Sequence, residues 1–283
     1  MADYSDILLT VDFDRTLTAP DSSIPRRNLE AIEYFIANGG TFTVNTGRSI
    51  PMCHSFIDTL PVNAPLLLYN GSAMYDSRKK AFISYYPIKI DAGQVLKELQ
   101  ERFPKLTVEI QGADAHYALK ENPGWQAYSE FNCAWAYTDY DHIPQPFIKF
   151  TFYGQFEDVT VASMYHAESW EIEMMAAAKA YLNERYGGLL DMFHPCPRIV
   201  DVHAKGVSKL QIAKDLQKML GKKHLVCVGD AHNDIEMLNG ADFAYCPSDG
   251  SIADRYENVC ACAQGAVADV IYEKIPLISA IEP

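Results

Sequence analysis

The stretch "ILLTVDFDRTLTAP", residues 7–20, joins an apolar run to two aspartates and indicates the fold. Its first five residues are apolar or β-branched, which is typical of a strand buried on both faces of a parallel sheet. Asp12 and Asp14 follow that run directly, with only Phe13 between them. Neighbouring carboxylates at a buried strand end repel each other and lose hydration, so we expect a cation to share them.

Strands and helices alternate on the C-terminal side of this stretch. A helix predicted over about 23–39 has Ser23 as its N-cap and Gly39 at its end. The segments that follow are predicted as a strand in "TFTVNTGR" (41–48), a helix over about 50–60 and a strand in "PLLLYNG" (65–71). This alternation predicts a doubly wound, Rossmann-like α/β core built on a parallel sheet.

The middle third has a different pattern. Alternating segments and two strong helices, at about 91–103 and 168–186, indicate a separate α+β unit. The strand–helix alternation resumes near residue 198 with "RIVDVH". We therefore predict a discontinuous core of residues 1–83 and 193–283, with an inserted α+β cap domain over 84–192. Its candidate substrate contacts are Trp125, Tyr128, Trp135 and His142.

Composition limits the function classes. The chain has 283 residues and a formal net charge of -13, which argues against a nucleic-acid or membrane-surface binder. A local cationic pocket for a small anion remains compatible with that charge. Seven cysteines, an odd number in scattered apolar contexts, are typical of reduced thiols. With acidic residues where a signal peptide has its basic region and no long apolar run, we expect a cytoplasmic location.

Four predicted strand ends carry polar side chains. Asp12 and Asp14 follow the first strand, Thr46 the second, Asn70 the third, and Asp230 the strand "HLVCVG". Ligands of parallel α/β sheets collect beyond the C-terminal strand ends. Mg²⁺ takes carboxylates, waters and phosphate oxygens, so Asp12, Asp14 and Asp230 are candidate metal ligands.

Each signal has a structural alternative when it is taken alone. In "GDAHND", residues 229–234, Asn233 and Asp234 could serve as helix N-caps. Lys209, near a predicted helix start, could be a solvated surface lysine, and Lys205 four residues earlier is a rival cation. The coincidence of these residues at one sheet edge favours a site.

The sequence resembles the haloacid dehalogenase-like phosphohydrolases, specifically the Cof-type subfamily IIB phosphatases, whose cap is of the C2 type. The segments "DFDRTLT", "NTGR" and "LLYNGSAMYD" are similar to this family's first two motifs and to the Asn-Gly stretch before its cap. "HAKGVSKLQIAKDL" and "VCVGDAHNDIEML" are similar to its lysine motif and last motif. The resemblance runs nearly end to end, with the motifs in the family's order.

The resemblance implies roles for the acidic residues and their cationic partner. Asp12 would be the nucleophile that forms an aspartyl-phosphate, and Asp14 the general acid and base. Thr46 and Lys209, which holds the family's position in Gly-Val-Ser-Lys, would hold the transferring phosphoryl group. Mg²⁺ would bind Asp12, the main-chain carbonyl of Asp14, and Asp230.

Further positions are predicted to support binding. Gly47, Arg48, Asn70 and Asn233 are candidate phosphate or substrate contacts. Asn233, together with Asp234, would orient the metal waters or Lys209 from outside the ligand shell. Arg15 stands where the family has glycine, which implies that the backbone there need not be one that only glycine can adopt.

The resemblance predicts a Mg²⁺-dependent phosphatase that hydrolyses a small phosphorylated metabolite, with a sugar phosphate as the default substrate. The alternatives are a phosphomutase of the same superfamily and a non-catalytic protein that binds a phosphorylated metabolite. No nucleic-acid or membrane partner is expected. The sequence does not indicate which oligomeric state the protein adopts.

Overall fold

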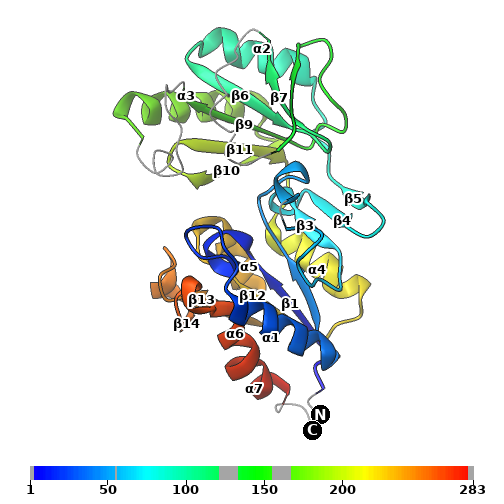
Figure 1. The fold of residues 1–283 in the computed structure, drawn as a ribbon. Coiled ribbons are helices and arrows are strands. Elements are labelled where there is room, and N and C mark those ends of the chain that lie inside the picture. The colour runs from blue at the N-terminus through cyan, green and yellow to red at the C-terminus, as the bar shows by residue number, and fades with distance from the viewer. Residues whose placement is uncertain (1–2, 55, 121–132, 155–166, 280–283) are drawn as a thin grey trace. The chain divides into compact units, whose positions relative to one another are not determined.

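A computed structural model describes residues 3–54, 56–120, 133–154 and 167–279 (Figure 1). The predicted cap residues Trp125 and Tyr128 lie outside these ranges. The chain divides into two compact units. The first unit consists of Met1–Gly47, Phe56–Ser84 and Ser208–Pro283, and the second of Arg48–Ser55 and Tyr85–Val207.

The first unit contains a five-stranded parallel sheet in the order β14-β13-β12-β1-β2. The strands of this sheet are β1 (Ile7–Val11), β2 (Thr41–Val44), β12 (His224–Val228), β13 (Phe243–Pro247) and β14 (Glu257–Val259). Val11 of β1 lies opposite both Val228 of β12 and Val44 of β2, so these three strands end level with one another. The predicted doubly wound α/β core is confirmed.

A smaller antiparallel sheet in the first unit comprises β3 (Leu66–Leu68), β4 (Ala73–Asp76) and β5 (Ala81–Tyr85). An isolated parallel bridge between Asn45 and Leu67 connects β3 to the end of β2. The C-terminal end of β3 therefore lies beside the C-terminal end of β2.

Helices complete the first unit: α1 (Arg26–Ala37), α4 (Lys209–Met219), α5 (Ile235–Gly240), α6 (Ala266–Asp269) and α7 (Ile275–Ser279), with a π-helical turn Val270–Lys274 between the last two. Ile212 and Leu216 of α4 and Met237 of α5 pack in one apolar cluster with Leu8 and Leu225 of the sheet. This packing fixes the start of α4, and with it Lys209, against the sheet.

Two local predictions in the first half of the chain are wrong. In the helix predicted over 50–60, the described residues form only a 3₁₀ turn, Pro51–Cys53, and further turns over residues 56–59. Ser23 does not cap α1 either. Its hydroxyl donates to Asp21, and Pro25 occupies the N-cap position.

The second unit is built on a six-stranded sheet in the order β10-β11-β9-β6-β7-β8. Its strands are β6 (Leu106–Gln111), β7 (His116–Leu119), β8 (Trp135–Thr138), β9 (Lys149–Gly154), β10 (Leu190–Cys196) and β11 (Ile199–Ala204). The helices α2 (Ala92–Arg102) and α3 (Ser169–Tyr186) pack on one face of this sheet. They correspond to the helices predicted at about 91–103 and 168–186.

The opposite face of this sheet is polar and buried. Val108 and Ile110 of β6 belong to the apolar cluster under the helices, so Glu109 and Gln111, which alternate with them, point to the other face. We call this surface the polar face; its members include Glu109, Gln111, His116, Lys149, Thr151, Asp201 and His203.

The second domain boundary differs from the prediction of residue 193. The strand in "RIVDVH", assigned from sequence to the core, is β11, which pairs antiparallel with β9 and β10 in the second unit. The second unit therefore extends to Val207. A run buried on both faces resembles a parallel core strand, but here Val200 and Val202 contact the helices while Asp201 belongs to the polar face. Among the described residues, no helix is both long and apolar enough to cross a membrane.

Candidate active site

The level strand ends of the first unit bring the predicted polar residues to one edge. Asp12 immediately follows β1, and its N–H donates to the carbonyl of Val228 at 2.9 Å. Asp230 stands two residues after β12, and Thr46 two residues after β2. The parallel pairing of β1 with both neighbours thus places these three residues at the same end of the sheet.

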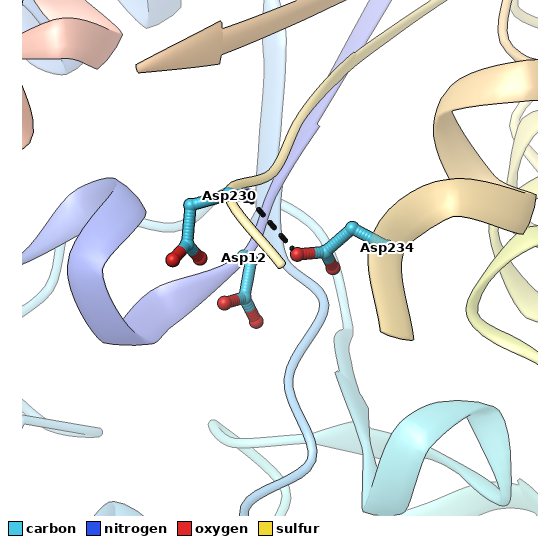
Figure 2. Close-up of side chains that lie close together, drawn as sticks. All are labelled: Asp12, Asp230 and Asp234. Carbon is cyan, nitrogen blue, oxygen red and sulfur yellow. Dashed lines mark hydrogen bonds between the residues drawn. The ribbon is translucent and has the colours of Figure 1, made fainter. Parts of the chain in front are cut away.

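Figure 2 shows three carboxylates that converge at this edge. Asp12, Asp230 and Asp234 each offer one carboxylate oxygen, and these atoms all lie within 4.8 Å of one another. All three residues are buried. We call these three residues the acidic site.

Lys209 binds two members of the acidic site. Its Nζ lies 2.6 Å from Asp12 Oδ1 and 2.7 Å from Asp234 Oδ1. Ser208 caps α4 by accepting the N–H of Gln211, and Asn45 Nδ2 donates to the Lys209 carbonyl at 2.8 Å. The start of α4 is therefore fixed, and the buried ammonium is directed at the carboxylates.

The rival Lys205 has a different environment. It belongs to the second unit, its side chain is 54% exposed, and its Nζ pairs with Asp191 at 2.6 Å. The geometry therefore favours Lys209 as the cation of the site.

The acidic site carries more negative charge than Lys209 neutralises. Burial raises the pKa of Asp12 well above its ordinary value, and the charges of Asp234, Asp230 and Asp14 raise it further, against the opposing effect of Lys209. Burial and the Asp234 charge raise the pKa of Asp230 to about 7. Burial lowers the pKa of Lys209, but the two carboxylates outweigh it and raise that pKa above its usual range. An additional cation beside these carboxylates would lower their pKa values.

Asp234 orients its neighbours. Its Oδ1 accepts from Lys209, and its Oδ2 accepts the N–H groups of Asp230 and Ala231, each at 3.1 Å. Figure 2 shows the contact with Asp230 as a dashed line. Asp234 stands at the N-cap position of α5 but makes no cap bond to that helix, and its bond to the Ala231 N–H caps the 3₁₀ turn His232–Asp234 instead. Both oxygens are engaged by the protein, which fits the predicted orienting role.

The turn after β1 places Asp14 half-buried next to the acidic site. Thr16 Oγ1 in this turn donates to Asp230 Oδ1 at 3.1 Å, a contact that the sequence analysis did not anticipate although Thr16 lies inside the first motif. Arg15 has a φ of 58°, in the left-handed region. Glycine favours this region but other residues also adopt it, so the structure agrees with the implication that this backbone is not one that only glycine can adopt.

Thr46, Gly47 and Asn70 lie together at the ends of β2 and β3. The Thr46 carbonyl accepts the Asn70 N–H at 3.0 Å, and the Thr46 N–H donates to Leu67. A Cβ added to Gly47 would lie 2.7 Å from Asn70 Oδ1, so a larger residue at this position would displace the Asn70 side chain. These predicted phosphate contacts thus form one compact loop pair.

The remaining predicted residues have different positions. Asn233 is half-buried in the 3₁₀ turn His232–Asp234, next to Asp234 in the chain. Arg48 falls in the second unit, where its Nη1 donates to the Met52 carbonyl at 3.3 Å. Its proximity to the acidic site stays a prediction.

The donor set fits a hard divalent cation. Asp12 and Asp230 would offer oxygen ligands, which Mg²⁺ prefers, and their charge exceeds that of Lys209. Asp234 belongs to the same group by distance, but its oxygens already accept hydrogen bonds. Asp14 would contribute a main-chain carbonyl rather than its carboxylate.

Comparison with known proteins agrees with this geometry. The family model of haloacid dehalogenase-like hydrolases matches residues 9–253. The 5-amino-6-(5-phospho-D-ribitylamino)uracil phosphatase YbjI of Escherichia coli is 23% identical over 244 residues, covering 84% of this chain and 83% of the relative. YcsE of Bacillus subtilis, with the same activity in its name, is 22% identical over 83% of this chain and 80% of its own length.

Solved structures share the fold. A haloacid dehalogenase-like hydrolase from Bacteroides thetaiotaomicron superposes with a TM-score of 0.78 at 18% identity, covering 96% of this chain and 98% of that one. The subclass IIB sugar phosphatase BT4131 has a TM-score of 0.71 at 16% identity, covering 93% and 97%.

Carboxylates and a threonine at the strand ends of a parallel sheet, with the ammonium of Lys209 at the start of α4 bonded to Asp12, are the arrangement expected of an α/β hydrolase that acts on a phosphoryl group. Within that class, the chain belongs to the haloacid dehalogenase-like hydrolases, in their Cof-type branch, and is a phosphatase.

Proposed function

We propose that this phosphatase hydrolyses the phosphomonoester of a small sugar or sugar-like polyol, with Mg²⁺ as cofactor and an aspartyl-phosphate on Asp12 as intermediate. The observation that carries the proposal is the acidic site, in which the ammonium of Lys209 is bonded to Asp12 and Asp234. Such an arrangement suits attack on a phosphate because the fixed cations offset repulsion between two anions.

Asp12 would attack phosphorus in line and displace the leaving alcohol. Lys209 holds Oδ1 of Asp12 and would also neutralise the oxygens of the transferring phosphoryl group. Asp14, in the turn that follows β1, would protonate the leaving oxygen and then deprotonate the hydrolytic water. Asp12, the Asp14 carbonyl and Asp230 would hold Mg²⁺, which would shield the negative charges of nucleophile and phosphate.

Thr46, Gly47 and Asn70 would bind the phosphoryl oxygens from the ends of β2 and β3. The substrate class is supported by relatives: YbjI and YcsE are named for a phosphorylated ribityl compound, and BT4131 for sugar phosphates. These names share a phosphate on a polyhydroxylated carbon chain, and that shared chemistry is what we propose for this chain.

The test is phosphate release by purified wild-type protein and the Asp12→Asn variant, with and without Mg²⁺. A panel of sugar, polyol and nucleoside monophosphates ranked by kcat/KM defines the substrate class. We expect wild-type turnover that depends on Mg²⁺ and a loss of about a thousandfold or more in Asp12→Asn. An Asp21→Asn variant, changed at an exposed position in the same unit, controls for handling.

Three outcomes contradict parts of the proposal. Full turnover by Asp12→Asn would remove the nucleophile assignment. Transfer of phosphate to a second sugar hydroxyl, with no inorganic phosphate released, would establish the phosphomutase alternative. Binding without turnover of any panel member would establish the non-catalytic alternative.

A further inference from the structure

The polar face of the second unit contains a buried chain of three functional groups. His116 Nε2 lies 2.6 Å from Ser49 Oγ, and His116 Nδ1 lies 2.9 Å from Glu109 Oε1. Relative exposures are 0% for Ser49, 1% for His116 and 0% for Glu109. Glu109 and His116 come from the neighbouring strands β6 and β7, whereas Ser49 lies far away in the sequence.

The order serine, histidine, carboxylate is that of a hydrolytic triad, but the environment opposes that chemistry. Ser49 is closed to solvent, so no substrate reaches its hydroxyl in this structure. Burial lowers the pKa of His116, but the Glu109 carboxylate outweighs it and raises the pKa to about 9. A protonated imidazole donates from both nitrogens and cannot accept the serine proton at neutral pH. The hydrogen bonds of His116 to Ser49 and Glu109 are therefore suited to holding Ser49 in place.

Ser49 organises the turn that follows the predicted phosphate-binding loop. Its Oγ accepts the Met52 N–H at 3.4 Å, while the Met52 carbonyl accepts from Arg48 Nη1 at 3.3 Å. The segment Arg48–Ser55 belongs to the second unit, and the peptide bond from Gly47 to Arg48 joins it to the first. Thr46 stands three residues before Ser49.

We propose that His116 and Glu109 are positioning residues: through Ser49 they hold the turn Arg48–Met52 and so fix the Gly47–Arg48 backbone next to Thr46. The inference rests on the proposed function, because it assigns the phosphoryl group to the Thr46 loop. Loosening this anchor weakens binding of the phosphoryl group equally in the ground state and the transition state. KM then rises while kcat is retained.

The variants exploit the two nitrogens of His116. Asn places its amide nitrogen near the Nδ1 position, where it reaches Glu109 but not Ser49. Gln places its nitrogen near the Nε2 position, where it reaches Ser49. His116→Asn and Ser49→Ala therefore break the anchor, whereas His116→Gln retains it. His194→Asn, at an exposed histidine of the same unit, is the matched control.

We expect Ser49→Ala and His116→Asn to raise both KM and the inhibition constant of inorganic phosphate about three- to tenfold, the equivalent of one lost hydrogen bond. Their kcat stays within about twofold of wild type. His116→Gln and His194→Asn stay near the wild-type KM. The double variant Ser49→Ala/His116→Asn is no worse than either single variant, because both changes break the same bond.

Thermal melting of each variant separates this role from a purely structural one. An unchanged KM in Ser49→Ala and His116→Asn overturns the inference, and so does a KM in His116→Gln as high as in His116→Asn. Labelling of Ser49 by a fluorophosphonate probe overturns it in favour of an active triad. Wild-type protein without Mg²⁺-dependent turnover refutes the proposed function and this inference together. Active wild type with unaltered variants refutes the inference alone.

Discussion

The acidic site of the first unit and the polar face of the second are both buried and charged, but they differ in charge balance. On the polar face, Lys149 Nζ pairs with Asp201 Oδ2 at 2.7 Å, and His116 pairs with Glu109. Each carboxylate there has a cation of its own. In the acidic site, three carboxylates share Lys209. A balanced cluster is complete without a ligand, whereas a cluster with excess charge indicates a site for one.

The largest expected effect separates the two clusters by removing the cation of each. Lys209→Met leaves Asp12 and Asp234 without their partner, so we expect a loss of about 3–5 kcal/mol in the free energy of unfolding. Turnover should fall at least about a hundredfold, since an electrostatic contact to the phosphoryl group is lost. Urea unfolding and phosphate release measure the two effects.

Two controls sharpen this prediction. Lys149→Met should destabilise the protein by a similar amount, about 3–5 kcal/mol, because it breaks a buried pair on the polar face. Added Mg²⁺ should restore part of the stability of Lys209→Met and none of that of Lys149→Met. Lys205→Met, at an exposed pair, should change stability by less than about 1 kcal/mol. Identical responses of both buried-lysine variants to Mg²⁺ would contradict the distinction between the clusters.

The pH dependence of stability tests the balance of the polar face. Glu109 raises the folded-state pKa of His116 to about 9, above its unfolded value near 6.5, and Cys133 Sγ also lies 3.7 Å from Nδ1. The resulting stability is fully present below about pH 6.5 and is lost as the pH rises through about 9. Its size is about 3 kcal/mol.

Chemical denaturation between pH 6 and 10 measures this loss. In His116→Gln the corresponding decline should be absent, because glutamine does not titrate. A decline of equal size in wild type and His116→Gln would assign the pH dependence to another group.

Cation binding tests the excess charge of the acidic site. Mg²⁺ at a hundred times its dissociation constant should stabilise wild type by about 2.7 kcal/mol, and chelation should reverse this. Asp230→Asn should lose most of the gain, whereas Glu30→Gln, at an exposed helix position, should keep it. Melting temperatures with Mg²⁺ and with chelator measure the effect. A full gain in Asp230→Asn would exclude Asp230 as a ligand.

The smallest expected effect concerns backbone strain beside the acidic site. Arg15 has a φ of 58°, so Arg15→Gly should raise stability by about 1 kcal/mol or less. Arg15→Ala removes the same guanidinium but keeps a Cβ, so the difference between the two variants isolates the backbone contribution. Equal unfolding midpoints in urea would show that the left-handed turn carries no strain.

Much of the acidic site could be predicted because it depends on chain order. Asp12, Thr46, Asn70 and Asp230 each follow an apolar strand, and a parallel sheet brings such strand ends to one edge. Asp14 lies near Asp12 because only one residue separates them in the sequence. The sequence could not show that both oxygens of the Asp234 carboxylate are occupied, because its partners include Lys209, which lies on another helix.

The second unit was less predictable for a physical reason. Glu109, His116 and Ser49 come from two strands and a distant turn, and nothing local distinguishes them from surface residues. The sequence of β11 resembles that of a strand in the α/β core domain, because it is buried on both faces. Which sheet the strand joins depends on its pairing with β9, and the sequence of β11 alone does not specify that pairing.

By itself, the sequence determined the α/β core, the order of its motifs and the residues at its strand ends, because local periodicity and chain order encode these features. The tertiary structure decided the extent of the second unit, the left-handed backbone of Arg15 and the partners of each buried charge. Those features depend on contacts between segments far apart in the chain, and local sequence patterns do not specify them.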